Sequence, residues 1–158
     1  MNGLKDTLLT LTVVTTGLSA GLLAAFAYAV MPGLDRAGPS VAVPAMQRIN
    51  VAILNPLFAV IFVGGVVFGA LSLWAFWRDD LRWWIVAAVI LVVIGLVITG
   101  IANVPANNRL DAAGDVHGPD AARAWSDFYG NWVRWNVIRA VATAAGCATL
   151  VVGVLSTR

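Results

Sequence analysis

The chain has few of the residues on which most catalytic and metal sites depend. Its 158 residues include one cysteine, Cys147, and one histidine, His117, and glutamate is absent. A lone cysteine excludes a disulfide within the chain. Zinc and iron–sulfur sites built from several cysteine and histidine ligands are excluded for the same reason. Charge is also scarce, since Asp, Glu, Lys and Arg make up 11% of the chain, against about 25% in soluble domains.

Apolar residues take the place of the missing charges. They account for 60% of the sequence, and the mean hydropathy is +0.86. The net charge is only +2, without basic tracts or a nucleic-acid motif, so we exclude nucleic-acid binding. The sequence predicts an all-α, multi-pass integral membrane protein.

The apolar runs predict four membrane-spanning helices, because a helix needs about 20 apolar residues to cross a bilayer. They cover about 8–30, 51–77, 83–102 and 132–155. Long loops are expected at 31–50 and 103–131, on the same side of the membrane, with both termini and the tight turn around 78–82 on the other side. The expected architecture is one domain, residues 1–158, folded as an antiparallel four-helix bundle. No internal repeat is evident.

Small residues recur every four positions in the spans, as in Gly65 and Gly69 or in Ala140, Ala144 and Ala148. This spacing lets membrane helices approach closely. The same stripes would serve contacts between chains, so a homo-oligomer stays open.

The compact turn contains Arg78 and Arg82, and Lys5 lies at the same end of the bundle. Positive charge in short loops favours the cytoplasmic side. We therefore expect cytoplasmic termini, with the long loops outside.

Amide side chains gather where three of the spans meet the long loops. The second span is preceded or opened by Gln47, Asn50 and Asn55, the third ends near Asn103 and Asn107, and the fourth carries Asn136. All of these ends face the same side of the membrane. The sequence therefore predicts that the amides converge at one face of the bundle.

The beginning of the fourth span carries a line of aromatic and polar residues: Tyr129, Trp132, Trp135, Asn136 and Arg139. Their spacing places them on one face of a helix. A face in contact with lipid has no use for an Asn and an Arg. The pattern therefore favours the wall of a pocket for a flat aromatic molecule.

Each of these residues also has a structural interpretation. Asn103 and Asn107 are able to cap a helix end near Pro105, and Asn55 to satisfy a kink at Pro56. Arg139 is long enough to reach the membrane interface. The tryptophans suit an aromatic belt. His117 is a general base or weak metal ligand on one interpretation, and a solvated loop residue on the other.

Taken together, the motifs resemble those of the anthrone oxygenase-like family of small four-helix membrane proteins. They are Met46-Gln47-x-x-Asn50 with Asn55-Pro56, Asn103-x-Pro-x-Asn107-Asn108-Arg109-Leu110, and Trp132-x-x-Trp135-Asn136-x-x-Arg139. Many bacterial members have no assigned activity, and a fold does not set a substrate. For this chain the resemblance implies a location in the bacterial inner membrane.

The resemblance implies dioxygen-dependent oxidation of a hydrophobic aromatic or phenolic compound to a quinone, without a required cofactor. Such chemistry needs an aromatic slot, donors for a developing oxyanion and a proton acceptor. Tyr129, Trp132 and Trp135 suit the slot, with Gln47, Asn50 and Asn55 as further substrate contacts. The candidate catalytic residues are Arg139, Asn136, Asn103, Asn107 and His117. The acceptor is open between His117, Asp127 and a water molecule held by the amides.

A second class of function uses the same slot without chemistry. The chain would then be an accessory membrane protein that binds a quinone, a lipid or a haem. A bis-His haem is excluded by the single histidine, whereas a single-ligand haem or a bound metal stays open. A proton-coupled transporter is disfavoured, because no carboxylate lies within the spans.

Overall fold

The computed structural model describes residues 3–157, which form helices and short connections without any strand in that range. Four of its helical stretches are long and apolar enough to cross a membrane: Gly3–Ala37, Pro56–Ala75, Leu81–Ala112 and Gly118–Ser156. The expected class is confirmed: the chain is a multi-pass membrane protein built as an all-α bundle.

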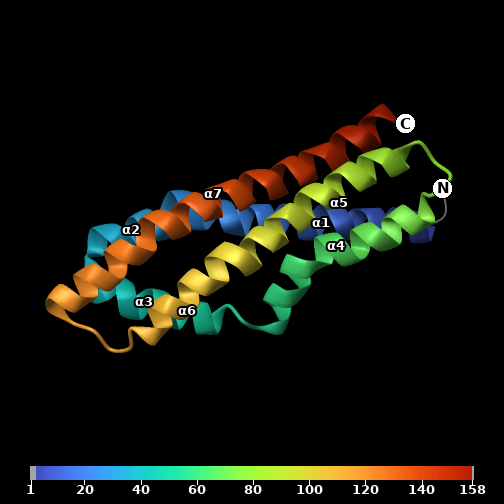
Figure 1. The fold of residues 1–158 in the computed structure, drawn as a ribbon. Helices are drawn as coiled ribbons and strands as arrows, with labels where there is room; N and C mark the ends of the chain where they lie inside the picture. Colours follow the sequence, from blue (N-terminus) through green and yellow to red (C-terminus); the bar gives the residue numbers. More distant parts are fainter. Residues whose placement is uncertain (1–2, 158) are drawn as a thin grey trace.

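Figure 1 shows both termini at one end of the molecule, beside the turn between α4 (Pro56–Ala75) and α5 (Leu81–Ile98). The first of the four helical stretches joins α1 (Gly3–Ala25), the π-helical turn η1 (Phe26–Val30) and α2 (Met31–Ala37). The third stretch joins α5, the π-helical turn η2 (Thr99–Asn103) and α6 (Val104–Ala112). α7 (Gly118–Ser156) is a single helix of 39 residues.

The expected long loops at 31–50 and 103–131 are instead mostly helical. The first holds α2 and most of α3 (Pro39–Ala52), and the second holds α6 and the beginning of α7. These segments bury apolar side chains against one another, including Met31, Met46, Leu110 and Trp125. Because these segments are amphipathic and pack against one another, they form helices, although their hydropathy alone indicates connecting loops.

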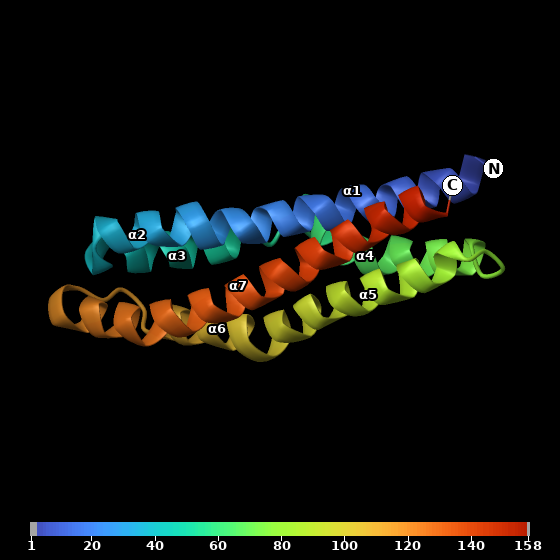
Figure 2. The ribbon, with the colours of Figure 1, turned by 90° about the horizontal axis from the view of Figure 1, so that it is seen from above.

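The bundle also has an internal repeat that the sequence does not make evident. The order α1, η1, α2, α3 in the first half corresponds to α5, η2, α6, α7 in the second. In each half the short helix, α2 or α6, has proline at its second position, and a Gly-Pro pair lies at the start of the helix that follows. α1 packs mainly against α4, and α5 mainly against α7. Figure 2 shows the end of the bundle away from the termini, with α2 and α3 on one side and α6 and the beginning of α7 on the other. The halves differ at Ile53–Asn55. In the first half these residues interrupt the helix between α3 and α4, whereas α7 of the second half continues without a break.

Proline explains the two π-helical turns. Its ring clashes with the carbonyl four residues earlier, and it cannot donate a backbone hydrogen bond. For Pro32 that carbonyl belongs to Tyr28, inside η1, and for Pro105 it belongs to Ile101, inside η2. Widening the turn relieves the clash, so that Met31 N–H bonds to Phe26 O and Val104 N–H to Thr99 O. Such turns are frequent at functional sites.

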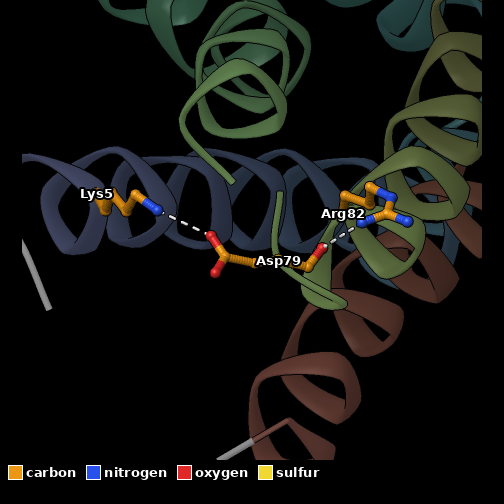
Figure 3. Close-up of polar contacts among 3 residues, drawn as sticks. All are labelled: Lys5, Asp79 and Arg82. Atoms are coloured by element: carbon orange, nitrogen blue, oxygen red, sulfur yellow. Dashed lines mark hydrogen bonds and ion pairs between the residues drawn. The ribbon is translucent and has the colours of Figure 1, made fainter. Parts of the chain in front are cut away.

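At the end of the bundle that holds the termini, polar contacts connect α1 and the start of α5 to the turn between α4 and α5. Figure 3 shows Lys5 Nζ bonding to Asp79 Oδ2 at 2.8 Å, and Arg82 Nη1 donating to the Asp79 carbonyl at 3.4 Å. Both charged groups of the ion pair are partly exposed, so the pair orients α1 and the turn more than it stabilises them.

Glycine allows the closest helix contacts. A Cβ at Gly64 would meet Thr15 Cγ2 at 2.8 Å, and one at Gly95 would meet Thr143 Oγ1 at 2.8 Å. Beside them, the hydroxyls of Thr12 and Ser72 share a buried hydrogen bond of 3.0 Å between α1 and α4. By contrast, Ala144 and Ala148, two of the small residues that recur every four positions in α7, are exposed. The tight contacts between helices are instead formed at glycines on α4, α5 and α7.

We expect Gly64→Val to destabilise the bundle by about 1–3 kcal/mol, because the new side chain overpacks the α1–α4 contact. The matched control is Gly21→Val, since a Cβ at Gly21 meets nothing within 4 Å. Thermal unfolding of both variants in detergent, followed by circular dichroism, measures the difference. Equal midpoints for the two variants would contradict the close contact.

Candidate functional site

A pocket of about 350 Å³ lies between the membrane-spanning helices and the two shorter helices α3 and α6. Its volume is at the lower end of the range for small-molecule sites, roughly 300–1,000 Å³. Side chains from α1, η1, α3, α4, η2, α6 and α7 line it: Leu22, Leu23, Phe26, Met46, Ile49, Asn50, Ile53, Leu54, Phe58, Phe62, Thr99, Asn103, Val104, Asn107, Asn108, Trp132 and Arg139. Most of this lining is apolar or aromatic.

The pocket borders the connection between α3 and α4, through Ile53 and Leu54. Figure 1 shows that the helical ribbon is interrupted at this connection. Asn55 ends the break by accepting a hydrogen bond from Phe58 N at 3.0 Å, and Pro56 then takes the first position of α4. Leu54, at the break, is 76% exposed and also lines the pocket. The pocket therefore has an apolar edge at the outer surface of the bundle.

Arg139 places a guanidinium group on the pocket wall although its side chain is only 7% exposed. Nε and Nη2 donate to Asn136 Oδ1 at 3.1 and 2.9 Å, and Nη1 donates to Thr99 Oγ1 at 2.9 Å. The ion pairs within residues 3–157 are Lys5–Asp79 and His117–Asp115, so no carboxylate in this range neutralises Arg139. Its charge is buried with neutral partners only, and it does not reach out to the membrane surface.

Asn136 holds this arginine in place. It is fully buried, and its Nδ2 donates to the carbonyl of Leu23 at 2.9 Å. That bond leaves Oδ1 directed at Arg139, where it accepts the two guanidinium bonds. The Leu23 carbonyl lies just before η1, so a backbone group of α1 orients the charged group of α7.

Trp132 forms the aromatic wall beside Arg139. The guanidinium carbon lies 5.4 Å from the centre of the Trp132 ring, within the range of a cation–π contact. Trp132 Nε1 donates to Asn107 Oδ1 at 2.7 Å, and the ring centre of Phe26 lies 5.8 Å away. On α4, Phe58 and Phe62 stack at 4.9 Å with an interplanar angle of 17°. Flat apolar surfaces thus face the pocket from more than one side.

Asn103 joins η2 to α7 across the pocket. It is 1% exposed, and its Nδ2 donates to the Trp132 carbonyl at 3.1 Å. Neither Asn103 nor Asn107 caps a helix end with its side chain. The two amides instead fix the backbone and the ring of the same tryptophan.

The sequence agrees with this architecture over most of its length. The family profile described as anthrone oxygenase matches residues 9–149. The chain belongs to the anthrone oxygenase family. No curated protein and no solved structure gave a significant match. The match spans every element that lines the pocket of this family member.

Of the residues expected in the site, the structure brings Asn50, Asn103, Asn107, Trp132 and Arg139 to the pocket wall, with Asn136 directly behind Arg139. Five others lie outside the lining. Asn55 is exposed and caps α4. Gln47 links α3 to the end of α6 by donating to the carbonyls of Leu110 and Gly114. Tyr129 packs on Trp125, and Trp135 lies under Arg134.

His117 is the fifth residue outside the pocket. Its side chain is 79% exposed, and its Nε2 lies 3.5 Å from Asp115 Oδ1 in the connection before α7. Asp127 is also exposed. The pocket lining contains no Asp, Glu, His, Lys or Tyr among the described residues. Residues 3–157 contain no cluster of three or more metal-binding side chains either.

Several lining residues were not expected from the sequence. Thr99 lies four residues before Asn103, and Phe58 lies four residues before Phe62, so helical spacing relates each pair. Phe26 had no such signal, because the first span is uniformly apolar around it. A larger hollow of about 660 Å³ lies at the opposite end, beside Asp79 and Thr157. Among the described residues, the titratable groups on its wall are the carboxylates of Asp79 and Asp80. The one aromatic ring of that described lining, Phe76, is already covered by Lys5, whose Nζ lies 5.0 Å from the ring centre.

We expect Asn136→Leu to lower the free energy of unfolding by about 3 kcal/mol, because it leaves a buried guanidinium without its main acceptor. Asn131→Leu is the matched control, since Asn131 is exposed on the same helix. Denaturant unfolding in mixed micelles compares the two. An Asn136→Leu variant as stable as the control would show that Arg139 does not depend on this amide.

Proposed function

We propose that the protein is a membrane-embedded oxygenase that uses dioxygen to oxidise a hydrophobic aromatic or phenolic substrate to a quinone. The observation that carries the proposal is the buried charge of Arg139 on the wall of an aromatic pocket. A buried charge is retained at considerable free-energy cost unless something compensates it. An anion that forms in the pocket during a reaction would supply that compensation.

An anthrone illustrates the chemistry. Loss of a proton from the carbon opposite its carbonyl gives an enolate, whose oxygen would accept hydrogen bonds from Arg139. The electron-rich enolate passes one electron to dioxygen, and the carbon radical then combines with superoxide to form a peroxide. Loss of water leaves the second carbonyl of the quinone. One oxygen atom enters the product and the other leaves as water, so the substrate and dioxygen supply all the electrons.

The residues of the pocket suit the first step. Arg139 has one free N–H on each of Nη1 and Nη2 after its bonds to Thr99 and Asn136, and the planar group is held rigid by both. Preorganised donors of this kind are worth roughly 3–4 kcal/mol each at a developing oxyanion. Stacking on Trp132 and its neighbours adds about 0.5–1.5 kcal/mol per ring pair beyond burial.

The proposal gives no catalytic role to His117 or Asp127, because both are exposed away from the lining. The proton instead leaves to water, and Arg139 shifts the equilibrium by stabilising the enolate. Trp132 is positioned as the ring platform, and Asn136, Asn103 and Asn107 position the groups that contact substrate.

The absence of an acid–base group from the described lining also favours a second candidate. A pocket with an exposed apolar edge at Leu54 suits a quinone held as a ligand by an accessory subunit, without chemistry. The oxygen-uptake experiment below separates this candidate from the oxygenase.

We expect saturable oxygen uptake with quinone formation when the detergent-purified protein is given a simple anthrone. Arg139→Met is expected to reduce kcat about 10²–10³-fold, because it removes the donors to the oxyanion. Arg134→Met, exposed on the same helix, and His117→Ala are expected to retain the wild-type rate. Oxygen electrode traces and quinone absorbance measure both, with autoxidation in empty micelles subtracted.

Uptake no faster than autoxidation, by protein shown to be folded, would overturn the oxygenase and leave the accessory candidate. A large loss of rate in His117→Ala would instead restore that histidine as the proton acceptor.

We further propose that the protein lies in a bacterial inner membrane with its termini in the cytoplasm. The short turn between α4 and α5 carries Arg78, and Arg82 follows at the second position of α5. Asp79 of the same turn bonds to Lys5 of α1 (Figure 3). Basic residues in short loops determine orientation more strongly than those in long segments.

This orientation predicts that a membrane-impermeant thiol reagent labels Asp115→Cys in intact cells and labels Asp80→Cys only after lysis. The native Cys147 lies within the apolar part of α7, and the unsubstituted chain controls for its reaction. The reverse labelling pattern would invert the proposed topology.

A further inference from the structure

Buried polar atoms in folded proteins nearly always have a hydrogen-bond partner. Within the described residues, three buried side-chain atoms lack one: Thr16 Oγ1, Asn50 Nδ2 and Asn103 Oδ1. Thr16 lies in the tight contact between α1 and α4, beside Gly65. The other two belong to residues that line the same pocket. The unsatisfied groups are therefore concentrated where a ligand would bind.

The orientation of the Asn103 amide follows from its surroundings. The Trp132 carbonyl is able only to accept, so the NH₂ group of Asn103 must face it, as the 3.1 Å contact shows. The oxygen of the same amide is then left as a buried acceptor without a donor. Reversing the amide would place two acceptors together and would leave the NH₂ group unpaired.

The opposite requirement holds at Arg139. Its remaining N–H groups need an acceptor, and Asn50 Nδ2 is a further donor without a partner. Two bonds hold these groups, Arg139 to Thr99 and Asn103 to Trp132, and both connect η2 with α7. They lie about one turn apart on η2 and about two turns apart on α7. A ligand that fills the pocket meets both kinds of group.

We propose that Asn103 determines specificity by accepting a hydrogen bond from a hydroxyl group on the ring system of the ligand. The ligand class is then an aromatic compound with two distinct oxygen functions. One is a carbonyl or ionised oxygen for Arg139, and the other is a free O–H for Asn103. The inference rests on the proposed function for the aromatic nature of the occupant, but not on the occupant being oxidised.

The energetic reason is the cost of leaving Asn103 Oδ1 unpaired. A ligand that fills the pocket also keeps water from reaching this oxygen. A ligand without a donor leaves the oxygen buried and unsatisfied, which costs about 1–3 kcal/mol, or roughly 5–150-fold in affinity. Sites built to bind a hydroxyl reject analogues that lack it for this reason.

Binding of ligands that are already at the quinone oxidation level tests the proposal apart from catalysis. The probes are 2-hydroxyanthraquinone, its methyl ether and unsubstituted anthraquinone, which cannot undergo the proposed oxidation. Dissociation constants come from quenching of tryptophan fluorescence in detergent, with empty micelles as the partitioning blank. We expect wild-type protein to bind the hydroxy compound at least about 10-fold more tightly than the other two.

Two variants locate the preference. Asn103→Leu is expected to bind all three probes within about twofold of one another, mainly because the hydroxy compound binds less tightly. Asn131→Leu is the matched control, because Asn131 is exposed on α7 and lies outside the pocket lining, and it is expected to keep the wild-type preference. A merely structural role of Asn103 would weaken all three probes equally.

The wild-type measurement alone decides the matter if Asn103→Leu does not fold. Equal affinity of the wild type for the three probes, or no binding of any of them, would overturn the proposal. A preference for the hydroxyl without oxygen uptake from any anthrone would support the Asn103 inference and remove the oxygenase. Uptake without the preference would do the reverse.

Discussion

The structure depends on one unusual constraint, a guanidinium group buried in a membrane protein without a carboxylate partner in the described chain. Arg139 is retained because three elements hold it: Asn136 beside it on α7, Thr99 on η2, and the Leu23 carbonyl of α1 acting through Asn136. A low-dielectric environment makes such a charge costly when unpaired and strongly attractive to an anion. The same network therefore explains both the rigidity of the bundle centre and its suitability for stabilising an enolate.

The irregular helices serve this arrangement. Pro105 forces a wide turn at η2, and that turn carries Thr99 and Asn103, which contact Arg139 and the Trp132 backbone. The break before Pro56 removes one helical wall and leaves an apolar edge at the outer surface. The two π-helical turns and the break between α3 and α4 border the pocket, whereas the end with the termini packs closely through glycine.

Membership of the anthrone oxygenase family narrows the chemistry but does not set the substrate. The pocket adds what the family cannot provide: a small volume, aromatic walls, one cation and two amide atoms without partners. Under the proposed oxygenase function, the electrons come from the substrate and the described lining supplies donors and aromatic surfaces. The same lining would suit a bound quinone, and only the fate of dioxygen distinguishes the two.

The sequence by itself determined the membrane class and the convergence of Asn103, Trp132 and Arg139, because hydropathy and helical spacing are local properties of the chain. It did not separate Trp132 from Trp135, or Asn50 from Asn55, because neighbouring positions at a span end share the same pattern. Only the tertiary structure placed His117 in solvent and Thr99 against Arg139. The contact of Thr99 with Arg139 depends on the π-helical turn η2 and on the packing of that turn against α7. The turn arises where proline sterics meet packing between distant segments, which no local pattern records.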